Sequence, residues 1–329
     1  MGMPLLLIVI IAIALIFDLL NGMHDSSNIV ATMISSRAMT PRAALGISAA
    51  AHFAGPFLFG VAVATTIGHE VVDPAAISSA VIIAALGSAI LWNLITWYLG
   101  WPSSTSHALI GGLIGAVTLA SGFDTIHLAG LEKVLIALFI SPLLGLVLGY
   151  LVLKLIYFLA RGATPKVNTL FKRAQYGTSV ILALSHGTND AQKTMGIIAM
   201  AMVTTGYVGE FQVPWWVITL SASAIALGTL AGGWRLIKTL GGKFYKIRPV
   251  HAFGSQLASA SIILGAALLG GPVSTTQVVS SAIMGAGSAD RVSKVRWTVS
   301  RDIAVAWLLT IPVAAVLAAV LYLIVDLFL

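Results

Sequence analysis

Long apolar runs recur along almost the whole chain, and they restrict the fold more than any other feature of the sequence. The runs are about 20 residues long, the length of helix that crosses the hydrocarbon core of a bilayer. Of the 329 residues, 58% are hydrophobic and only 9% are charged, whereas roughly a quarter are charged in an average soluble domain. The sequence therefore predicts an all-α, polytopic helical membrane protein and excludes an ordinary water-soluble enzyme.

The positive charge is concentrated in a few short segments between apolar runs. The formal net charge is +7, and the basic segments are residues 37–42, 154–173, 235–248 and 291–301. The positive-inside rule assigns such segments to cytoplasmic loops. The loops that contain Glu70, Asp73, Asp124 and Glu210 then belong to the opposite side. We interpret the charge as a topology signal and expect no nucleic-acid partner.

This topology predicts two sets of five membrane segments, with both termini extracytoplasmic. The first set is 4–36, 43–66, 76–100, 101–122 and 131–160, and the second is 176–205, 214–234, 249–270, 271–288 and 302–328. The chain thus divides into a first repeat (1–160), a basic cytoplasmic linker (161–175) and a second repeat (176–329). Residues 1–18 are interpreted as mature helix, because a basic n-region and a cleavage pattern are missing.

Two short motifs each occur twice, in the same order. GMHDSSN at 22–28 matches GTNDAQK at 187–193, and WPSSTS at 101–106 matches GPVSTT at 271–276, at offsets of 165 and 170. Because each half crosses the membrane an odd number of times, the second half is inverted relative to the first. Inverted repeats are typical of secondary transporters, whose site lies at the midplane between the halves. We expect broken or re-entrant helices there, with all four motif copies converging on them.

Each copy of the first motif places an acid, Asp25 or Asp190, deep inside an apolar segment. A carboxylate at this depth is costly and normally faces a cavity or a transport pathway. Gly22 and Gly187 favour a local helix break, which would offer backbone carbonyls to a cation. A purely structural, hydrogen-bonded carboxylate is the alternative for either acid alone.

The second motif predicts helix N-termini that are rich in hydroxyl groups. Helix starts of this kind bind anions. The neutral donors that would surround a tetrahedral oxyanion are Ser104, Thr105, Ser106, Ser274, Thr275 and Thr276. Ordinary helix capping is the alternative interpretation of each segment.

An anion beside two carboxylates creates an electrostatic problem, because like charges about 4 Å apart repel by roughly 4 kcal/mol at an effective dielectric constant near 20. Cations must therefore enter with the anion. Sodium ions bound by Asp25, Asp190 and the side-chain oxygens of Asn28 and Asn189 would relieve the repulsion, as would protonation of a carboxylate. Either solution produces symport.

Four further polar residues are candidates for proton transfer or for supporting hydrogen bonds. His24 and His186 flank the two acids and could carry a coupled proton or remain neutral and hydrogen-bonded. His107 is expected to support the hydroxyl segment. Lys193 stands three residues after Asp190, where it can form an ion pair or neutralise the incoming anion. The sequence assigns no metal site with certainty, and without cysteine it excludes thiolate metal sites and disulfides.

At these motifs the chain resembles the PiT family of inorganic phosphate transporters. NGMHDSSN with the following SSRAMTPR is similar to the first family motif, and SHGTNDAQKTMGII is similar to the second. The resemblance covers nearly the whole chain and implies phosphate as substrate, an inverted-repeat fold, and site roles for Asp25, Asn28, Asn189 and Asp190. The His24-Asp25 pair is similar to that of bacterial low-affinity permeases that move metal phosphate with protons, which favours protons over sodium.

The sequence therefore predicts a cation-coupled phosphate importer of the plasma (cell inner) membrane that works by alternating access, with H⁺ or Na⁺ as the coupling ion. The cargo is free phosphate or a metal complex of phosphate, and a homo-oligomer is compatible with the sequence. Alternatives are a sulfate permease of the same family, an intramembrane hydrolase and an anion channel. No nucleophile elbow, HExxH element or P-loop is present, so we expect neither enzymatic activity nor a cofactor.

Overall fold

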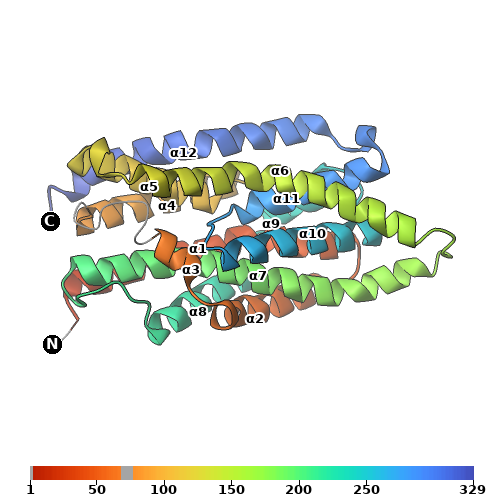
Figure 1. Cartoon of the computed structure of the whole chain (residues 1–329), viewed down its shortest axis with the longest axis horizontal. Helices are drawn as coiled ribbons and strands as arrows, with labels where there is room; N and C mark the ends of the chain where they lie inside the picture. Colours follow the sequence, from red (N-terminus) through yellow and green to blue (C-terminus); the bar gives the residue numbers. More distant parts are fainter. Residues whose placement is uncertain (1–2, 68–76) are drawn as a thin grey trace.

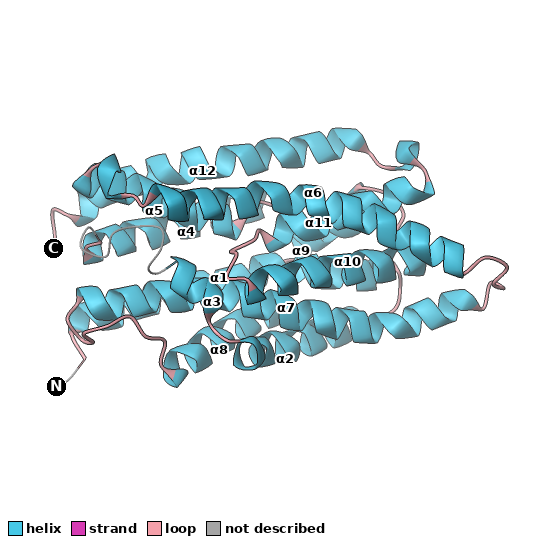
Figure 2. Cartoon of the chain, in the orientation of Figure 1, coloured by secondary structure: helices cyan, strands magenta, loops and turns pink. Residues whose placement is uncertain are grey.

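The structure, a computed structural model, describes residues 3–67 and 77–329. In these residues every regular element is a helix, and the long helices form an elongated bundle (Figures 1 and 2). The first half contains α1 (Leu5–Ser35), α2 (Pro41–Phe59), α3 (Ala62–Thr65), α4 (Ser79–Leu99), α5 (Thr105–Ser121), η3 (Phe123–Thr125) and α6 (Leu128–Leu159). The second half contains α7 (Val167–Thr204), α8 (Trp215–Ala231), α9 (Trp234–Lys238), η4 (Thr239–Lys243), α10 (Pro249–Leu268), α11 (Thr275–Asp290), η5 (Val292–Lys294) and α12 (Trp297–Val325).

The two halves repeat the same series of helices in opposite directions. Both chain termini lie at one end of the bundle, and the connection from α6 to α7 lies at the other end (Figure 1). The halves also exchange partners, since α1 packs on α8 as α7 packs on α2, and α5 packs on α12 as α11 packs on α6. This arrangement confirms the predicted inverted repeat.

The basic segments gather at one end of the bundle. The Tyr176 hydroxyl donates to the Ala38 carbonyl at 3.4 Å, and the Gln175 amide donates to the Pro249 carbonyl at 3.2 Å. Arg248 is 3.0 Å from Asp290. These contacts bring four distant parts of the chain to the same end, as the positive-inside rule requires of cytoplasmic loops. The α7 helix begins at Val167 and carries part of the basic segment on its first turns.

The predicted helix breaks at Gly22 and Gly187 are wrong, because α1 and α7 run unbroken through both glycines. The glycines instead permit close helix contact. A Cβ atom at Gly22 would lie 2.2 Å from the Ile225 carbonyl oxygen, and one at Gly187 would lie 2.5 Å from the His52 carbonyl oxygen. Each motif glycine therefore seats its helix directly on the backbone of the other half.

The breaks lie instead in the helices that pack on α1 and α7. The α8 helix ends before Gly232, whose φ of 74° is left-handed, and α8 bends by 60° relative to the segment Trp234–Lys243. In the first half, Gly60, with a φ of 79°, separates α2 from α3. Left-handed backbone at these points suits glycine.

Polar side chains from α1 and α7 satisfy the backbone groups that these breaks leave free. The Ser26 hydroxyl accepts a hydrogen bond from the Gly233 N–H at 2.9 Å. In the other half, the Gln192 side chain accepts from the Val63 N–H at 2.7 Å and donates to the Gly60 carbonyl at 2.7 Å. Buried backbone groups need such partners, so each motif helix holds the broken segment of the opposite half.

Five described helices are long and apolar enough to cross a membrane, namely α1, α4, α6, α10 and α12, and the bent pair of α8 with Trp234–Lys243 makes a sixth candidate. All ten predicted segments contain a main helix. The main helices outside these five are too short or too polar to meet the length and hydropathy criterion by themselves. The α5 helix has only 17 residues, and α7 carries the polar motif. Two helices that contribute to the polar interior, α5 and α7, therefore fail the criterion, whereas α1 meets it although it carries Asp25.

Gly22→Ala is expected to destabilise the protein by roughly 1–3 kcal/mol, because the new methyl group overlaps the Ile225 carbonyl and α1 must move away from α8. The midpoint of chemical denaturation of the purified protein measures the change. Gly46→Ala on α2 is the matched control, since a Cβ there meets nothing within 4 Å. Equal stability of the two variants would contradict the close contact.

Candidate functional site

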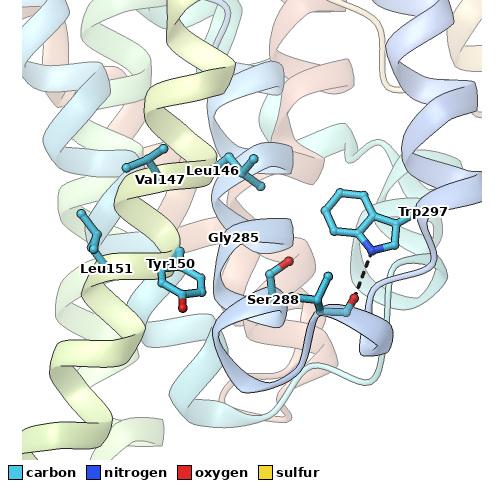
Figure 3. A pocket seen from close by; sticks show the side chains of 8 residues that line it. Leu146, Val147, Tyr150, Leu151, Gly285, Ser288 and Trp297 are labelled. Atoms are coloured by element: carbon cyan, nitrogen blue, oxygen red, sulfur yellow. Dashed lines mark hydrogen bonds between the residues drawn. The ribbon is translucent and has the colours of Figure 1, made fainter.

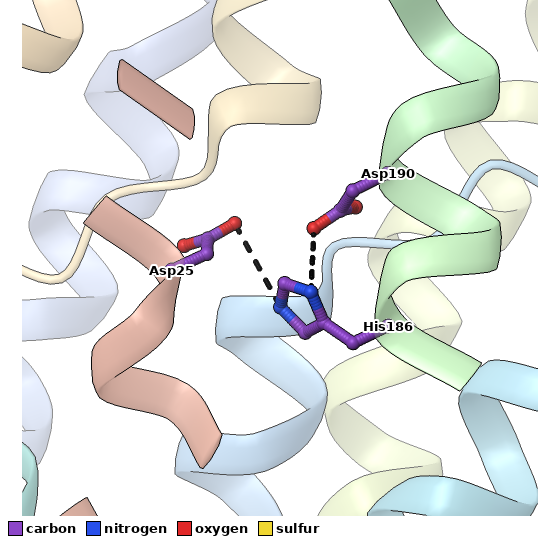
Figure 4. Close-up of side chains that lie close together, drawn as sticks. All are labelled: Asp25, His186 and Asp190. Atoms are coloured by element: carbon purple, nitrogen blue, oxygen red, sulfur yellow. Dashed lines mark ion pairs between the residues drawn. The ribbon is translucent and has the colours of Figure 1, made fainter. Parts of the chain in front are cut away.

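The two repeated acids meet in the interior of the bundle. Asp25 on α1 and Asp190 on α7 are both 0% exposed, and the His186 imidazole lies between them (Figure 4). One ligand atom from each of these three residues lies within 4.8 Å of the others. The duplicated motif therefore delivers both carboxylates to one buried centre, as the repeat predicted.

The Asp25 carboxylate is surrounded by donors from both halves. Its Oδ1 accepts hydrogen bonds from the Asn28 amide at 2.9 Å and from the Thr276 hydroxyl at 2.7 Å, and the His24 Nδ1 lies 3.2 Å away. Asn28 also donates to the Thr276 hydroxyl at 3.1 Å. The first motif is thus connected directly to the hydroxyl segment of the second half.

The Thr275 hydroxyl bridges the two acids. Its oxygen is 3.3 Å from Asp25 Oδ2 and 3.2 Å from Asp190 Oδ2, and the Thr105 hydroxyl reaches the same Asp25 oxygen at 3.4 Å. A hydroxyl carries only one proton, so Thr275 can donate to only one of the two carboxylates at a time. The other carboxylate is then held by its remaining partners.

Lys193 supplies one positive charge to this centre. Its ammonium forms an ion pair with Asp190 Oδ1, and both side chains are 0% exposed, as the spacing of three residues predicted. With neutral imidazoles at His24 and His186, two carboxylates and one ammonium leave a net charge of −1 in the buried centre. Such a centre attracts cations.

One serine at the start of α5 and one at the start of α11 cap their helices. Ser104 and Ser274 are helix caps that accept from the backbone N–H of His107 at 3.1 Å and of Gln277 at 3.3 Å, so for these two serines the capping interpretation holds in this conformation. The His107 ring also contacts the Ser104 hydroxyl at 2.6 Å, which is the supporting position expected for His107.

The remaining predicted residues connect the two helix starts to their surroundings. Ser106 donates to the Val273 carbonyl at 3.1 Å, which joins the tip of the α4–α5 hairpin to the tip of the α10–α11 hairpin. Asn189 donates to the Gly271 carbonyl at 3.3 Å rather than to either acid. Thr105, Thr275 and Thr276 are therefore the hydroxyl residues at the acids, while Ser106 and Asn189 position the tips.

Sequence reasoning gave no specific role to His52, although it lies at the centre. The His52 ring stacks on the His186 ring with centroids 4.9 Å apart, and its Nδ1 is 2.7 Å from the Thr229 hydroxyl. His52 thus fixes the plane of the imidazole between the acids. The signal was a histidine inside an apolar segment, but no spacing relates it to the motifs.

An apolar pocket lies apart from this centre. It has a volume of about 330 Å³ and lies between α6 and α11 beside Trp297 (Figure 3). Its lining is almost wholly apolar and includes none of the predicted site residues. An anion needs polar donors, so this pocket does not suit an anion.

Buried acids and hydroxyl-bearing helix starts, contributed by two inverted halves of a membrane bundle, define a transporter rather than an enzyme. Comparison with known proteins is more specific, because residues 21–318 match the phosphate transporter family. The chain belongs to this family.

Relatives of nearly the same length support the assignment. A probable low-affinity inorganic phosphate transporter of Rhizobium meliloti (strain 1021) is 45% identical over 98% of this chain and 97% of its own length. The Bacillus subtilis (strain 168) protein of the same description is 43% identical over 98% of each chain. Among solved structures, one described as the sodium-dependent phosphate transporter superposes with a TM-score of 0.88 at 25% identity, covering 98% of this chain and 100% of the other.

Proposed function

We propose that the protein imports inorganic phosphate together with cations, by alternating access of its two halves. The observation that carries the proposal is the buried centre of Asp25 and Asp190, bridged by Thr275 and neutralised only in part by Lys193. The descriptions of the relatives support phosphate as the cargo. The moving units would be the two repeats, 1–160 and 176–329, joined by the linker 161–175.

The hydrogen bonds of the centre suggest why the cation and phosphate are coupled. In this conformation the hydroxyls of Thr275 and Thr276 donate to carboxylates, so their protons are not free to bind an anion. A cation that binds the carboxylates occupies the lone pairs that now accept from these hydroxyls. The hydroxyls can then turn and donate hydrogen bonds to phosphate oxygens. We therefore propose that cations bind first and that Thr105, Thr275, Thr276 and the Asn28 amide then bind phosphate.

Both candidate coupling ions find support. The sodium dependence of the solved relative favours Na⁺, whereas the contacts of His24 with Asp25 and of His186 with both acids favour H⁺. Two carboxylates and an imidazole are also a suitable ligand set for a divalent metal. A metal ion brought in with phosphate would fit between Asp25, His186 and Asp190 as part of the cargo.

The proposed setting is the plasma membrane, with both termini extracytoplasmic. The basic segments share the end of the bundle that holds the α6–α7 connection, and the termini lie at the opposite end (Figure 1). Positive segments face the cytoplasm in plasma membrane proteins. Accessibility of a tag at Leu329 to a membrane-impermeant reagent in intact cells tests this orientation.

Uptake into proteoliposomes tests the function. We expect labelled phosphate to accumulate under an inward sodium or proton gradient and sulfate to accumulate much less, and repeating the assay with and without Mg²⁺ separates free phosphate from a metal complex. Equal uptake with and without both gradients would reject symport. Preferred uptake of sulfate would instead support a sulfate permease.

Thr275→Val keeps the shape of the side chain and removes the bridging hydroxyl. We expect the initial rate of phosphate uptake to fall about tenfold or more, because a hydrogen bond to a charged group contributes roughly 1.5–3 kcal/mol. Ser280→Ala is the matched control, because this serine is a buried hydroxyl on the same helix that makes no hydrogen bond to either acid. Wild-type rates for Thr275→Val would remove the bridge from the mechanism.

A further inference from the structure

A third buried acid lies near the centre but outside every motif. Asp18 is 0% exposed, and neither of its carboxylate oxygens has a hydrogen-bond partner. It stands seven residues before Asp25 on the unbroken helix α1, two turns away and about 10 Å along the helix axis. A buried carboxylate is normally paired or bound to a cation, so the missing partner needs an explanation.

Other polar groups without partners surround Asp18. The hydroxyls of Thr194 on α7 and Ser221 on α8 lie near its carboxylate, yet neither hydroxyl oxygen completes a hydrogen bond. Asn21 follows one turn later on the same helix and is also 0% exposed, with both amide atoms unpaired. Three helices thus direct unsatisfied oxygen atoms toward one buried position.

Close helix packing holds these groups together. The α1 helix approaches α8 at Gly22, where only a glycine fits against Ile225, and this contact lies one turn from both Asp18 and Ser221. The α7 helix packs on both α1 and α8 and brings Thr194, the residue after Lys193. The position is therefore built by the same contacts that build the centre.

The charges around Asp18 do not neutralise it. From α7 it faces Asp190, which is negative, and Lys193, whose ammonium is already paired with Asp190. The α8 and α4 helices contain no Asp, Glu, Lys, Arg or His. On α1 itself the nearest titratable groups are His24 and Asp25, which contact each other. When ionised, Asp18 therefore adds a second uncompensated negative charge to the interior.

We infer that Asp18, Thr194 and Ser221, with Asn21 beside them, form a second monovalent-cation site, separate from the phosphate centre. Its ligands are all oxygen atoms, which suit a sodium ion or a proton and not a soft metal. With both termini extracytoplasmic, the site lies on the external side of Asp25 along α1. A cation held there would offset the charge that phosphate brings to the centre; this role in uptake rests on the proposed function.

Thermal unfolding of the purified protein in detergent, without phosphate, tests the site. Sodium chloride titrated against choline chloride reports sodium binding, and a pH series without sodium reports protonation. We expect the wild type to be stabilised in one of the two series. The Asp18→Asn variant should lose at least about tenfold in apparent affinity in that series, or shift its pH midpoint by about one unit. Identical curves for the wild type and Asp18→Asn in both series would overturn the inference.

Hydroxyl variants give a second test that leaves the carboxylate in place. Ser221→Ala and Thr194→Val should each weaken the same response by about tenfold or less, since each removes one ligand. Ser223→Ala is the matched control, because this serine lies on the same helix and is bonded to the Thr219 carbonyl. If Ser223→Ala weakened the cation response as much as Ser221→Ala and Thr194→Val do, the effect would come from helix packing and the site would be overturned.

The assay separates this inference from the proposed function. Asp25→Asn, which removes one of the two acids of the centre, should keep a cation-dependent stabilisation, and the Asp18→Asn/Asp25→Asn double variant should lose it. Failure of phosphate uptake with this pattern intact would reject the transport proposal and keep the site. Gradient-driven uptake, together with no cation response that depends on Asp18, would support the transport proposal and reject the site.

Discussion

Phosphate uptake by Asp25→Asn is expected to fall to about 1% of the wild-type rate or less. The substitution keeps the size of the side chain, but it removes the charge that attracts the coupling cation, and its amide group opposes the donors Asn28 and Thr276. A hydrogen bond to a charged group contributes roughly 1.5–3 kcal/mol, and about 2.8 kcal/mol corresponds to a hundredfold change. Initial rates in proteoliposomes, normalised to protein content, measure the loss.

Asp124→Asn is the matched control for this experiment. Asp124 is exposed on η3, so the same chemical change should leave uptake near the wild-type rate. The Asp25→Asn protein should still elute as folded material, because the variant removes a buried negative charge without changing volume. Uptake above about a third of the wild-type rate in folded Asp25→Asn protein would remove Asp25 from the coupling site.

Lys193→Met is expected to destabilise the protein by roughly 3–5 kcal/mol, because it leaves the Asp190 carboxylate buried without its ammonium partner. The Asp190→Asn/Lys193→Met double variant should recover most of this loss, since it removes the unpaired charge as well. Denaturation midpoints of the single and double variants form a double-mutant cycle that isolates the pair.

An exposed pair of the same composition provides the control. Lys294 also pairs with an aspartate, Asp290, but both side chains are more than a quarter exposed. Lys294→Met should therefore cost only about 0–1 kcal/mol. If the single Lys193 variant and the double variant were equally unstable, the loss would come from packing around the lysine stem and not from the ion pair.

The repeat made the centre of the site predictable. Asp25 and Asp190 occupy the same place in two copies of one motif, and an inverted repeat brings equivalent residues to one interface. The hydroxyl segments followed by the same reasoning, although the sequence could not distinguish Ser104 and Ser274, which cap helices, from Thr275, which bridges the acids. That difference depends on how the two hairpin tips meet, and spacing within one segment does not encode it.

The positions of the helix breaks were not predictable from the glycines alone. Gly22 and Gly60 look alike in sequence, but Gly22 serves a close helix contact and Gly60 adopts left-handed backbone. Which role a glycine has depends on a partner helix that is distant in the chain. Asp18 was missed for a related reason, since the residue at the repeat offset of 165 is Ala183 and no duplicated pattern marks the acid.

The hydrogen bonds that Ser26 accepts from the start of α9 and Gln192 accepts from the start of α3 have a mechanical consequence. Each bent segment belongs to one half of the chain, but it is hydrogen-bonded to the acid-bearing helix of the other half. A displacement of α1 must drag α9, and a displacement of α7 must drag α3. We therefore expect a shift of either acid-bearing helix to displace the bend of the opposite half as well.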